Sequence, residues 1–264
     1  MGSATSQALA GARAALAGLG GKDGLATGEQ LFEAVRVIGD SAQLRSALAD
    51  SSADPAAKQA LVATVFASLG ASAKSLLTSI AASRWSTQDD LLAGIEEIGI
   101  RAIAGSAKSG VSIVDERMAF QAAVDSDAEL ELAVGSKLGS PDAKGALVAS
   151  LLSKKASAQT VAIVDQLVRQ PRGRRIGQLL STAADIVADE AGLAVATVVT
   201  AAPLSAAQLE RLRAGLAKSY GRDLKLNHVI DPAIIGGVRV QVGDDVIDGS
   251  VSTRLTDLRL QLAG

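Results

Sequence analysis

Two hydrophobic periods divide the chain. From Thr5 to about Asp189, apolar residues recur every three or four positions, which predicts a series of helices broken by Gly and Pro. STQDDLLAGIEEIGIRAIAG is typical of this region, because Ser86 and Asp89 predict a capping box at its start. Its apolar stripe contains Leu91, Ile95, Ile98 and Ala102. The charged residues that fall away from that stripe are Glu96, Glu97 and Arg101. Short helices of this kind predict a bundle.

The helical region also repeats itself. LRSALADSSADPAAKQALVATVF (44–66) matches LELAVGSKLGSPDAKGALVASLL (130–152), with Pro55 and Pro141 each placed to start a helix. The aligned pairs are Leu44 with Leu130, Pro55 with Pro141, Lys58 with Lys144 and Leu61 with Leu147, each 86 positions apart (144 − 58 = 86). Farther along, Leu91 and Leu92 match Leu179 and Leu180 at an offset of 88. This pattern favours a duplication over a coincidence between two alanine-rich segments, but two copies are too few for a solenoid.

At Gly192 the period changes from helical to alternating. The pattern predicts a strand at 193–200, a helix capped by Ser205 and Gln208 that ends at Gly221, and a second strand at 223–230. A hairpin follows through Gly243-Asp244-Asp245, and then a final helix. The apolar stripe of that helix contains Val251, Leu255, Leu258 and Leu262.

These patterns predict a mainly α protein with a small α+β C-terminal domain. We expect an N-terminal helical bundle at 1–105, a second, partial helical bundle at 106–190 that duplicates part of it, and a β-α-β-β-α unit at 191–264.

Composition argues against several classes of protein. Alanine supplies much of the hydrophobic content and only 2% of residues are aromatic, so an aromatic-lined ligand cavity is not expected. The net charge of −2 gives no general reason to bind nucleic acid. Without cysteine there is no disulfide, thiolate nucleophile or zinc-cysteine cluster. The longest uncharged run, 191–209, is interrupted by Pro203 and alternates like a strand, so no direct membrane insertion is expected.

The candidate chemical sites are weak. Gly236 and Gly237 precede a strand, whereas a phosphate loop needs glycines before a helix, so they are expected to allow a tight entry into the strand. His228, the only histidine, falls on the apolar side of a strand and is expected to be packed there. Asp244 and Asp245 lie at a predicted turn, where aspartate is common for backbone reasons. We therefore expect no catalytic residue, no cofactor and no metal.

One basic cluster, RQPRGRR (Arg169–Arg175), leaves an alternative open. Its arginines could bind RNA or phosphate in a helical accessory protein, although no aromatic residues are interleaved for base stacking. A solvated turn, or a docking point for an acidic partner, is the expected role. A small-molecule enzyme is the other alternative.

The segment VIDPAIIGGVRVQVGDDVIDGSVSTRLTDLRLQL closely resembles the C-terminal signature of the delta subunit family of F-type ATP synthase, which is related to the mitochondrial oligomycin-sensitivity-conferring protein. The signature residues include Asp231, Gly236, Gly237, Asp248, Gly249 and Arg254. The first hundred residues match the family's N-terminal six-helix domain more loosely. Typical members are shorter, because they lack a segment corresponding to the second copy.

The resemblance implies a non-catalytic subunit of the peripheral stalk, or stator, of the proton-translocating ATP synthase. Its implied partners are an N-terminal helix of the alpha subunit, the b-type stalk subunit and other F1Fo subunits, at the cytoplasmic face of the cell membrane. By analogy the surface that grips the alpha subunit is expected to involve Ala8, Ala12, Leu91, Ile95 and Ile98. Leu260, opposite the stripe of the final helix, is expected to face another chain. Which copy carries the partner groove stays open at this point.

Overall fold

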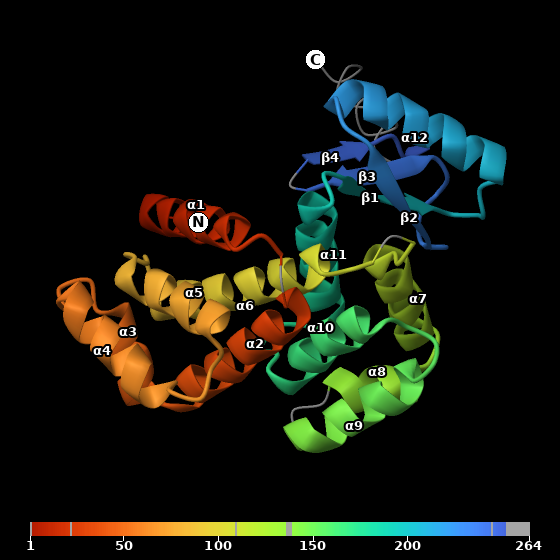
Figure 1. The fold of residues 1–264 in the computed structure, drawn as a ribbon. Helices are drawn as coiled ribbons and strands as arrows, with labels where there is room; N and C mark the ends of the chain where they lie inside the picture. The colour runs from red at the N-terminus through yellow and green to blue at the C-terminus, as the bar shows by residue number, and fades with distance from the viewer. Residues whose placement is uncertain (1, 22, 109, 136–138, 244, 252–264) are drawn as a thin grey trace, which may run out of the picture. The chain divides into compact units, whose positions relative to one another are not determined.

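Helix α6 (Gln88–Gly105) lies at the centre of the helical region in a computed structural model that describes residues 2–21, 23–108, 110–135, 139–243 and 245–251. The chain divides into two units, Met1–Val187 and Ala188–Gly264, which are described separately. Figure 1 shows the helices of the first unit and the sheet of the second. The prediction of a mainly α protein with a small α+β C-terminal part is confirmed.

Eleven helices are found in the described residues up to Glu190. They are α1 (Ser3–Gly18), α2 (Gly24–Asp40), α3 (Ala42–Ala49), α4 (Pro55–Val65), α5 (Ala71–Ala82), α6, α7 (Ile113–Asp125), α8 (Ala128–Gly135), α9 (Pro141–Leu152), α10 (Ala158–Arg169) and α11 (Ile176–Glu190). The two prolines begin α4 and α9 as predicted, and Asp54 and Ser140 accept hydrogen bonds as their N-caps.

The start of α6 differs from the prediction by one residue. Thr87, not Ser86, is the N-cap, and its side chain accepts a hydrogen bond from the backbone N–H of Asp90. Ser86 is used elsewhere: its backbone N–H donates to the hydroxyl of Thr5 on α1. Either residue satisfies the chemistry of an N-cap, so a contact with a distant helix decided between them.

Helices α7–α11 repeat α2–α6. We call α2–α6 the first copy and α7–α11 the second copy. Buried residues recur at an offset of 86 through α2–α4, in the pairs Thr27/Ile113, Gly28/Val114, Leu31/Arg117, Ala34/Phe120, Ile38/Val124, Leu48/Val134, Lys58/Lys144 and Val62/Val148. The offset becomes 87 in α5 and α10, because α9 is one residue longer than α4. It becomes 88 in α6 and α11, because the loop 170–175 is one residue longer than 83–87. The shift in offset therefore has two identifiable causes.

Close packing of α2 on α6 depends on glycine. A Cβ at Gly28 would lie 2.5 Å from the carbonyl oxygen of Gly99, and one at Gly99 would lie 2.6 Å from the ring of Phe32. The two backbones can therefore approach more closely than side chains would permit. Leu31, Val35 and other fully buried residues fill the remaining core of the first copy.

The second unit is built on a mixed sheet in the order β2-β1-β3-β4. Its described elements are β1 (Ala194–Thr200), α12 (Ala206–Tyr220), β2 (Leu224–Ile230), β3 (Val238–Val242) and β4 (Asp245–Asp248). Strand β1 pairs with β2 in parallel across α12 and with β3 in antiparallel. Leu212, Leu216 and Tyr220 of α12 pack on Val198 and its neighbours in the sheet.

Local signals in this unit were predicted well. Ser205 and Gln208 form the predicted capping box, and Gly221 ends α12 in the left-handed conformation. The hairpin joins β3 to β4, with Val242 opposite Asp245, so Asp245 begins a strand and does not lie in the turn. Asp244 and the predicted final helix with Leu255, Leu258 and Leu262 lie outside the described residues.

Candidate functional site

The first candidate surface is a hollow beside α1. It has a volume of about 430 Å³ and is lined by Ser3, Ala4, Gln7, Ala8, Ser83 and Arg84, that is, by the first two turns of α1 and the loop after α5. The four residues of α1 that line the hollow are two alanines, a serine and a glutamine, and these small or medium side chains leave the space open. The volume falls within the range of protein ligand pockets and is large enough for a few side chains of a docked helix.

Polar contacts hold α1 in place along one side of this hollow. The hydroxyl of Thr5 lies 3.0 Å from a carboxylate oxygen of Asp90 and accepts a hydrogen bond from the backbone of Ser86. About two turns farther along, Arg13 forms an ion pair of 2.6 Å with Glu97 of α6. The wall of the hollow is therefore tied to the most buried helix of the bundle.

The residues expected to grip a partner lie mostly beneath this surface. Ala8, Ala12, Leu91, Ile95 and Ile98 are each at most 5% exposed. Only Ala8 lines the hollow, and the other four belong to the hydrophobic core. The helical period identified a buried stripe, and in this structure those four side chains offer no surface to a partner. Their role in binding stays a prediction, and Leu260 lies outside the described residues.

The expected polar side of α6 is also buried. Glu96, Glu97 and Arg101 are each less than a tenth exposed, although they fall away from the apolar stripe. Arg101 and Arg13 both bond to Glu97, and the two carboxylate oxygens of Glu96 accept from Arg174 at 2.9 and 3.0 Å. The helix is therefore enclosed on its charged side as well, with carboxylates paired to arginines.

Most of the arginine cluster is paired within the bundle, which corrects the expectation of a solvated turn, and Arg175 alone of the four is exposed. Arg172 and Arg174 both pair with Glu96, and Arg169 pairs with Asp142 and Asp165. Burial lowers the pKa of Arg172, and the charge of Glu96 opposes that effect. Three of the four arginines thus have acidic partners within the same unit, which weakens the proposal that the cluster binds RNA or phosphate.

The second candidate surface is on the C-terminal unit. A hollow of about 360 Å³ is lined by Val199, Asp231, Ala233, Ile234, Ile235, Arg239, Asp248 and Ser250. Exposed apolar side chains lie in the same part of the sequence, at Val229, Ile230, Ile235, Val246, Ile247 and Val251. Ile235 is 73% exposed. A group of exposed aliphatic side chains beside a hollow is typical of a protein-binding surface.

The signature glycines shape this unit and do not form a phosphate loop. Gly236 and Gly237 both have positive φ values, of 85° and 88°. A Cβ at Gly237 would lie 2.5 Å from the carbonyl oxygen of Gly249, so the backbone segments before β3 and after β4 meet there. Asp231 and Asp248 line the hollow, while Arg254 lies outside the described residues.

The candidate catalytic and metal residues have structural contacts. His228 is partly buried, and its Nε2 lies 2.7 Å from the hydroxyl of Thr200 on the neighbouring strand. Within the described ranges, no three His, Cys, Asp or Glu residues are grouped in a way that could hold a metal ion. The hydroxyl of Thr200 donates its proton to the backbone carbonyl of Ala202, so His228 does not act on it as a base.

Similarity to known proteins decides the family. A profile of the ATP synthase delta (OSCP) subunit matches residues 101–262. The ATP synthase subunit delta of Leifsonia xyli subsp. xyli is 61% identical over 264 residues, which is 100% of both chains. Those of Streptomyces griseus subsp. griseus and Thermobifida fusca are each 36% identical, over 100% and 90% of both chains. The chain belongs to the ATP synthase delta (OSCP) subunit family.

As a delta-family subunit, the protein is a structural part of F-type ATP synthase and not a catalytic one. Its partners are other subunits of the F1Fo complex, of which it is a peripheral component. In the part of the chain that the structure describes, no helix has both the length and the hydrophobicity needed to cross a bilayer.

A solved ATP synthase structure also contains a chain that matches part of this delta-family subunit. A chain in the Toxoplasma gondii mitochondrial ATP synthase hexamer is 24% identical, with 62% of this chain and 97% of that one covered and a TM-score of 0.39. The relatives of similar length are more informative, because they span the second copy as well as the first.

Proposed function

We propose that this delta-family subunit is the static joint at the top of the peripheral stalk. In this role its first bundle holds an N-terminal helix of the alpha subunit, and its C-terminal unit holds the end of the b-type stalk at the cytoplasmic face of the cell membrane. The joint keeps the catalytic head from turning with the rotor, so that torque reaches the catalytic sites. The observation that carries the proposal is the hollow between α1 and the loop after α5.

The chemistry of this hollow supports a helix as its occupant. An amphipathic helix binds through small apolar anchors placed in a groove, and needs no reactive group in the receptor. Ala4 and Ala8 give the groove an apolar wall, and Arg84 adds a positive charge at its edge. Because α1 is tied to α6 through Thr5 and Arg13, a pull on a helix in the hollow is transmitted to the core of the bundle.

The experiment fills the hollow with a large side chain. Ala4→Trp is expected to weaken capture of a peptide from the N-terminus of the alpha subunit by at least about tenfold, since each 1.4 kcal/mol of lost binding is a factor of ten. Ala10→Trp is the matched control, because Ala10 is exposed on the same helix and does not line the hollow. Equal binding by the two variants would show that the peptide docks elsewhere. Aspartate at Ile95 or Leu167 would not test the groove, because both residues are buried in the core and a charge there would destabilise the fold.

The stalk contact has its own test. Ile235→Asp places a charge on the most exposed large apolar side chain among the described residues of the C-terminal unit, and is expected to reduce capture of the C-terminal segment of the b-type subunit. Leu132→Asp is the control, because Leu132 is 71% exposed but lies on α8. If both variants bind the stalk segment as the unmodified chain does, the surface around Ile235 is not the stalk site.

A further inference from the structure

Helix α6 stands in the same relation to the second copy as α1 does to the first. Helix α1 precedes α2 and α6 precedes α7, each across a short turn. The four buried residues of α1 coincide, 86 positions later, with four buried residues of α6. The pairs are Thr5/Leu91, Ala8/Gly94, Leu9/Ile95 and Ala12/Ile98. On α6 these positions are buried against the first bundle, so other residues of the helix, such as Glu96, make its contacts with the second copy.

The packing follows the same relation. Helix α1 packs against α5, and Thr5 touches Ser86 in the loop that follows α5. Helix α6 packs against α10, the counterpart of α5. Its residue Glu96 binds Arg172 and Arg174 in the loop that follows α10. Both helices thus contact the corresponding helix and the corresponding loop of the copy that follows them.

We infer that α6 is shared by two overlapping bundles: it is the last helix of the first bundle, α1–α6, and takes the place of α1 in a second bundle, α6–α11. Sharing explains why every residue of α6 from Leu91 to Ile103 except Ala93 is buried. It also explains why two adjacent carboxylates of α6 are buried in ion pairs. Glu97 pairs with Arg13 of α1, and Glu96 pairs with arginines of the loop after α10. One helix therefore carries the core of both bundles.

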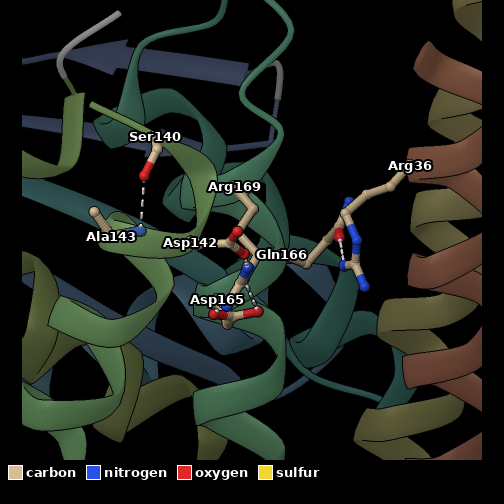
Figure 2. A network of polar contacts seen from close by, with 7 residues as sticks. All are labelled: Arg36, Ser140, Asp142, Ala143, Asp165, Gln166 and Arg169. Carbon is tan, nitrogen blue, oxygen red and sulfur yellow. Dashed lines mark hydrogen bonds and ion pairs between the residues drawn. The ribbon is translucent and has the colours of Figure 1, made fainter. Parts of the chain in front are cut away.

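Contacts from α2 fix the second bundle to the first. Figure 2 shows Arg36 of α2 reaching Gln166 of α10, where its Nη1 donates to Oε1 at 2.6 Å. Gln166 is fully buried, and it also donates to Gln170 at 3.2 Å. Gln170 in turn donates to the backbone carbonyl of Val35 and lies against Gly39, where a Cβ would collide with its amide. Buried, hydrogen-bonded amides of this kind hold one relative arrangement of the two copies.

At the described positions that correspond to the hollow beside α1, the second bundle is closed to a partner helix, a consequence that rests on the proposed function of that hollow. The counterparts of Ala4 and Ala8 on α6 are Asp90 and Gly94. Asp90 already contacts Thr5, and the ring of Trp85 covers Gly94. The counterpart of Ser83 is Gln170, which is packed on α2. The second bundle therefore serves as a rigid extension, and each chain binds one helix of the alpha type.

Rigidity can be measured directly, because the chain contains no cysteine that would compete for labels. Ala63→Cys on α4 and Ala149→Cys on α9 place spin labels at exposed, corresponding positions of the two copies. We expect one narrow distance distribution in the full-length chain. Glu96→Gln removes the charge that binds Arg172 and Arg174, and the distance distribution is expected to broaden although the contacts of α2 with Gln166 and Gln170 remain. Glu97→Gln is the matched control, since Glu97 pairs with Arg13 of α1 and with Arg101 of α6 itself.

If the distance distribution of Glu96→Gln is as narrow as that of the unmodified chain, α6 does not hold the two copies together and the inference is wrong. If circular dichroism shows that Glu96→Gln does not fold, Arg174→Gln replaces it, because Arg174 is a partly exposed partner of Glu96. Arg174→Gln is expected to broaden the distance distribution, and an unchanged distribution would also contradict the inference. Titration calorimetry with the alpha-subunit peptide is expected to give one site per chain, and two sites would overturn the inference. Complete absence of peptide binding would refute the proposed function, while the distance measurement would still decide whether α6 joins the copies.

Discussion

The two helical copies bury corresponding positions but close their cores differently. In the first copy, α2 and α6 meet at Gly28 and Gly99, and the backbones touch. The corresponding residues of the second copy are Val114 and Val187, which line a narrow apolar gap between α7, α10 and α11 that is too small for water. The pattern of buried positions sets which helices meet, and the size of the residue at the crossing sets how closely they pack.

The largest effect is expected from giving the first copy the residue of the second. Gly28→Val forces a branched side chain against the carbonyl of Gly99 and the side chain of Ile103. We expect the free energy of unfolding to fall by about 3 kcal/mol or more, at the upper end of overpacking effects, as measured by urea denaturation.

The control for this change is another helical glycine. Gly11 lies on the exposed face of α1, and a Cβ there would meet no atom within 4 Å. Gly11→Ala is expected to raise stability by about 0.5–1 kcal/mol, because alanine is the better helix former. Similar effects of the two substitutions would show that close approach at Gly28 is not what selects glycine there.

A second difference concerns one core position. Leu31 of the first copy corresponds to Arg117 of the second, and both are buried. Burial lowers the pKa of Arg117, which the charges of Asp185 and Asp125 oppose, and its Nε has no hydrogen-bond partner. The second copy therefore carries a desolvated cation where the first has a leucine.

We expect Arg117→Leu to stabilise the protein by about 1–2 kcal/mol, because a buried ionic group is often replaced favourably by an apolar one. Asp185 and Asp125 are exposed and remain solvated after the change. Thermal unfolding of the variant and of the unmodified chain would measure the effect. A loss of stability would mean that the guanidinium contributes polar contacts worth more than its desolvation.

The same comparison shows what the sequence could predict. The repeat, the prolines that begin α4 and α9, and the order of strands and helices follow from local signals and were predicted. The burial and ion pairs of Glu96 were not predicted, because its partners Arg172 and Arg174 lie more than seventy residues away in the sequence and no local periodicity connects them. Helical periodicity on α6 assumed one buried face, whereas this helix is packed from both sides.

The candidate site was predicted only in part for a related reason. A stripe such as Leu91, Ile95 and Ile98 identifies the core of a bundle, and the hollow lies where α1 passes the loop after α5. The residues that line it are small or polar, and so they carry no periodic signal.

A third difference lies in the hydrogen bonds that join α2 to the start of α5 in the first copy and α7 to the start of α10 in the second. In the first copy, Oε1 of Gln30 accepts from the backbone N–H of Gly70 at 2.8 Å. In the second, Glu116 accepts from the backbone and hydroxyl of Ser157 and from the hydroxyl of Thr160. Burial acts to raise the pKa of Glu116, but these hydrogen bonds outweigh it, and the pKa is lowered.

The second copy is therefore expected to be sensitive to acid. Because the pKa of Glu116 is lowered in the folded state, its hydrogen bonds contribute their full stability at pH values above the ordinary glutamate pKa of about 4.3. This contribution is lost as the pH falls through the pKa of Glu116 in the folded protein. Glu116→Gln should cost about 1 kcal/mol at neutral pH and make stability less dependent on pH below about 4.5. Denaturation curves at several pH values would show this. A pH dependence equal to that of the unmodified chain would place the acid-sensitive group elsewhere.

The smallest expected difference lies at the caps of α4 and α9. Asp54 accepts from the backbone N–H of Ala56, and Ser140 accepts from that of Ala143. Asp54→Ala and Ser140→Ala are each expected to cost about 1 kcal/mol, because each leaves an N–H of the first turn without its acceptor. Asp54 also places a negative charge at the positive end of a helix dipole, an effect of a few tenths of a kcal/mol that salt screens.

Salt therefore distinguishes the two caps. In high salt the cost of Asp54→Ala should fall by a few tenths of a kcal/mol, while that of Ser140→Ala stays the same. Asp54→Asn keeps the hydrogen-bond acceptor without the charge, so it should show only the part that salt removes. If the two alanine variants respond to salt alike, the corresponding caps stabilise their helices through the hydrogen bond alone, and the charge that distinguishes the first copy here contributes nothing.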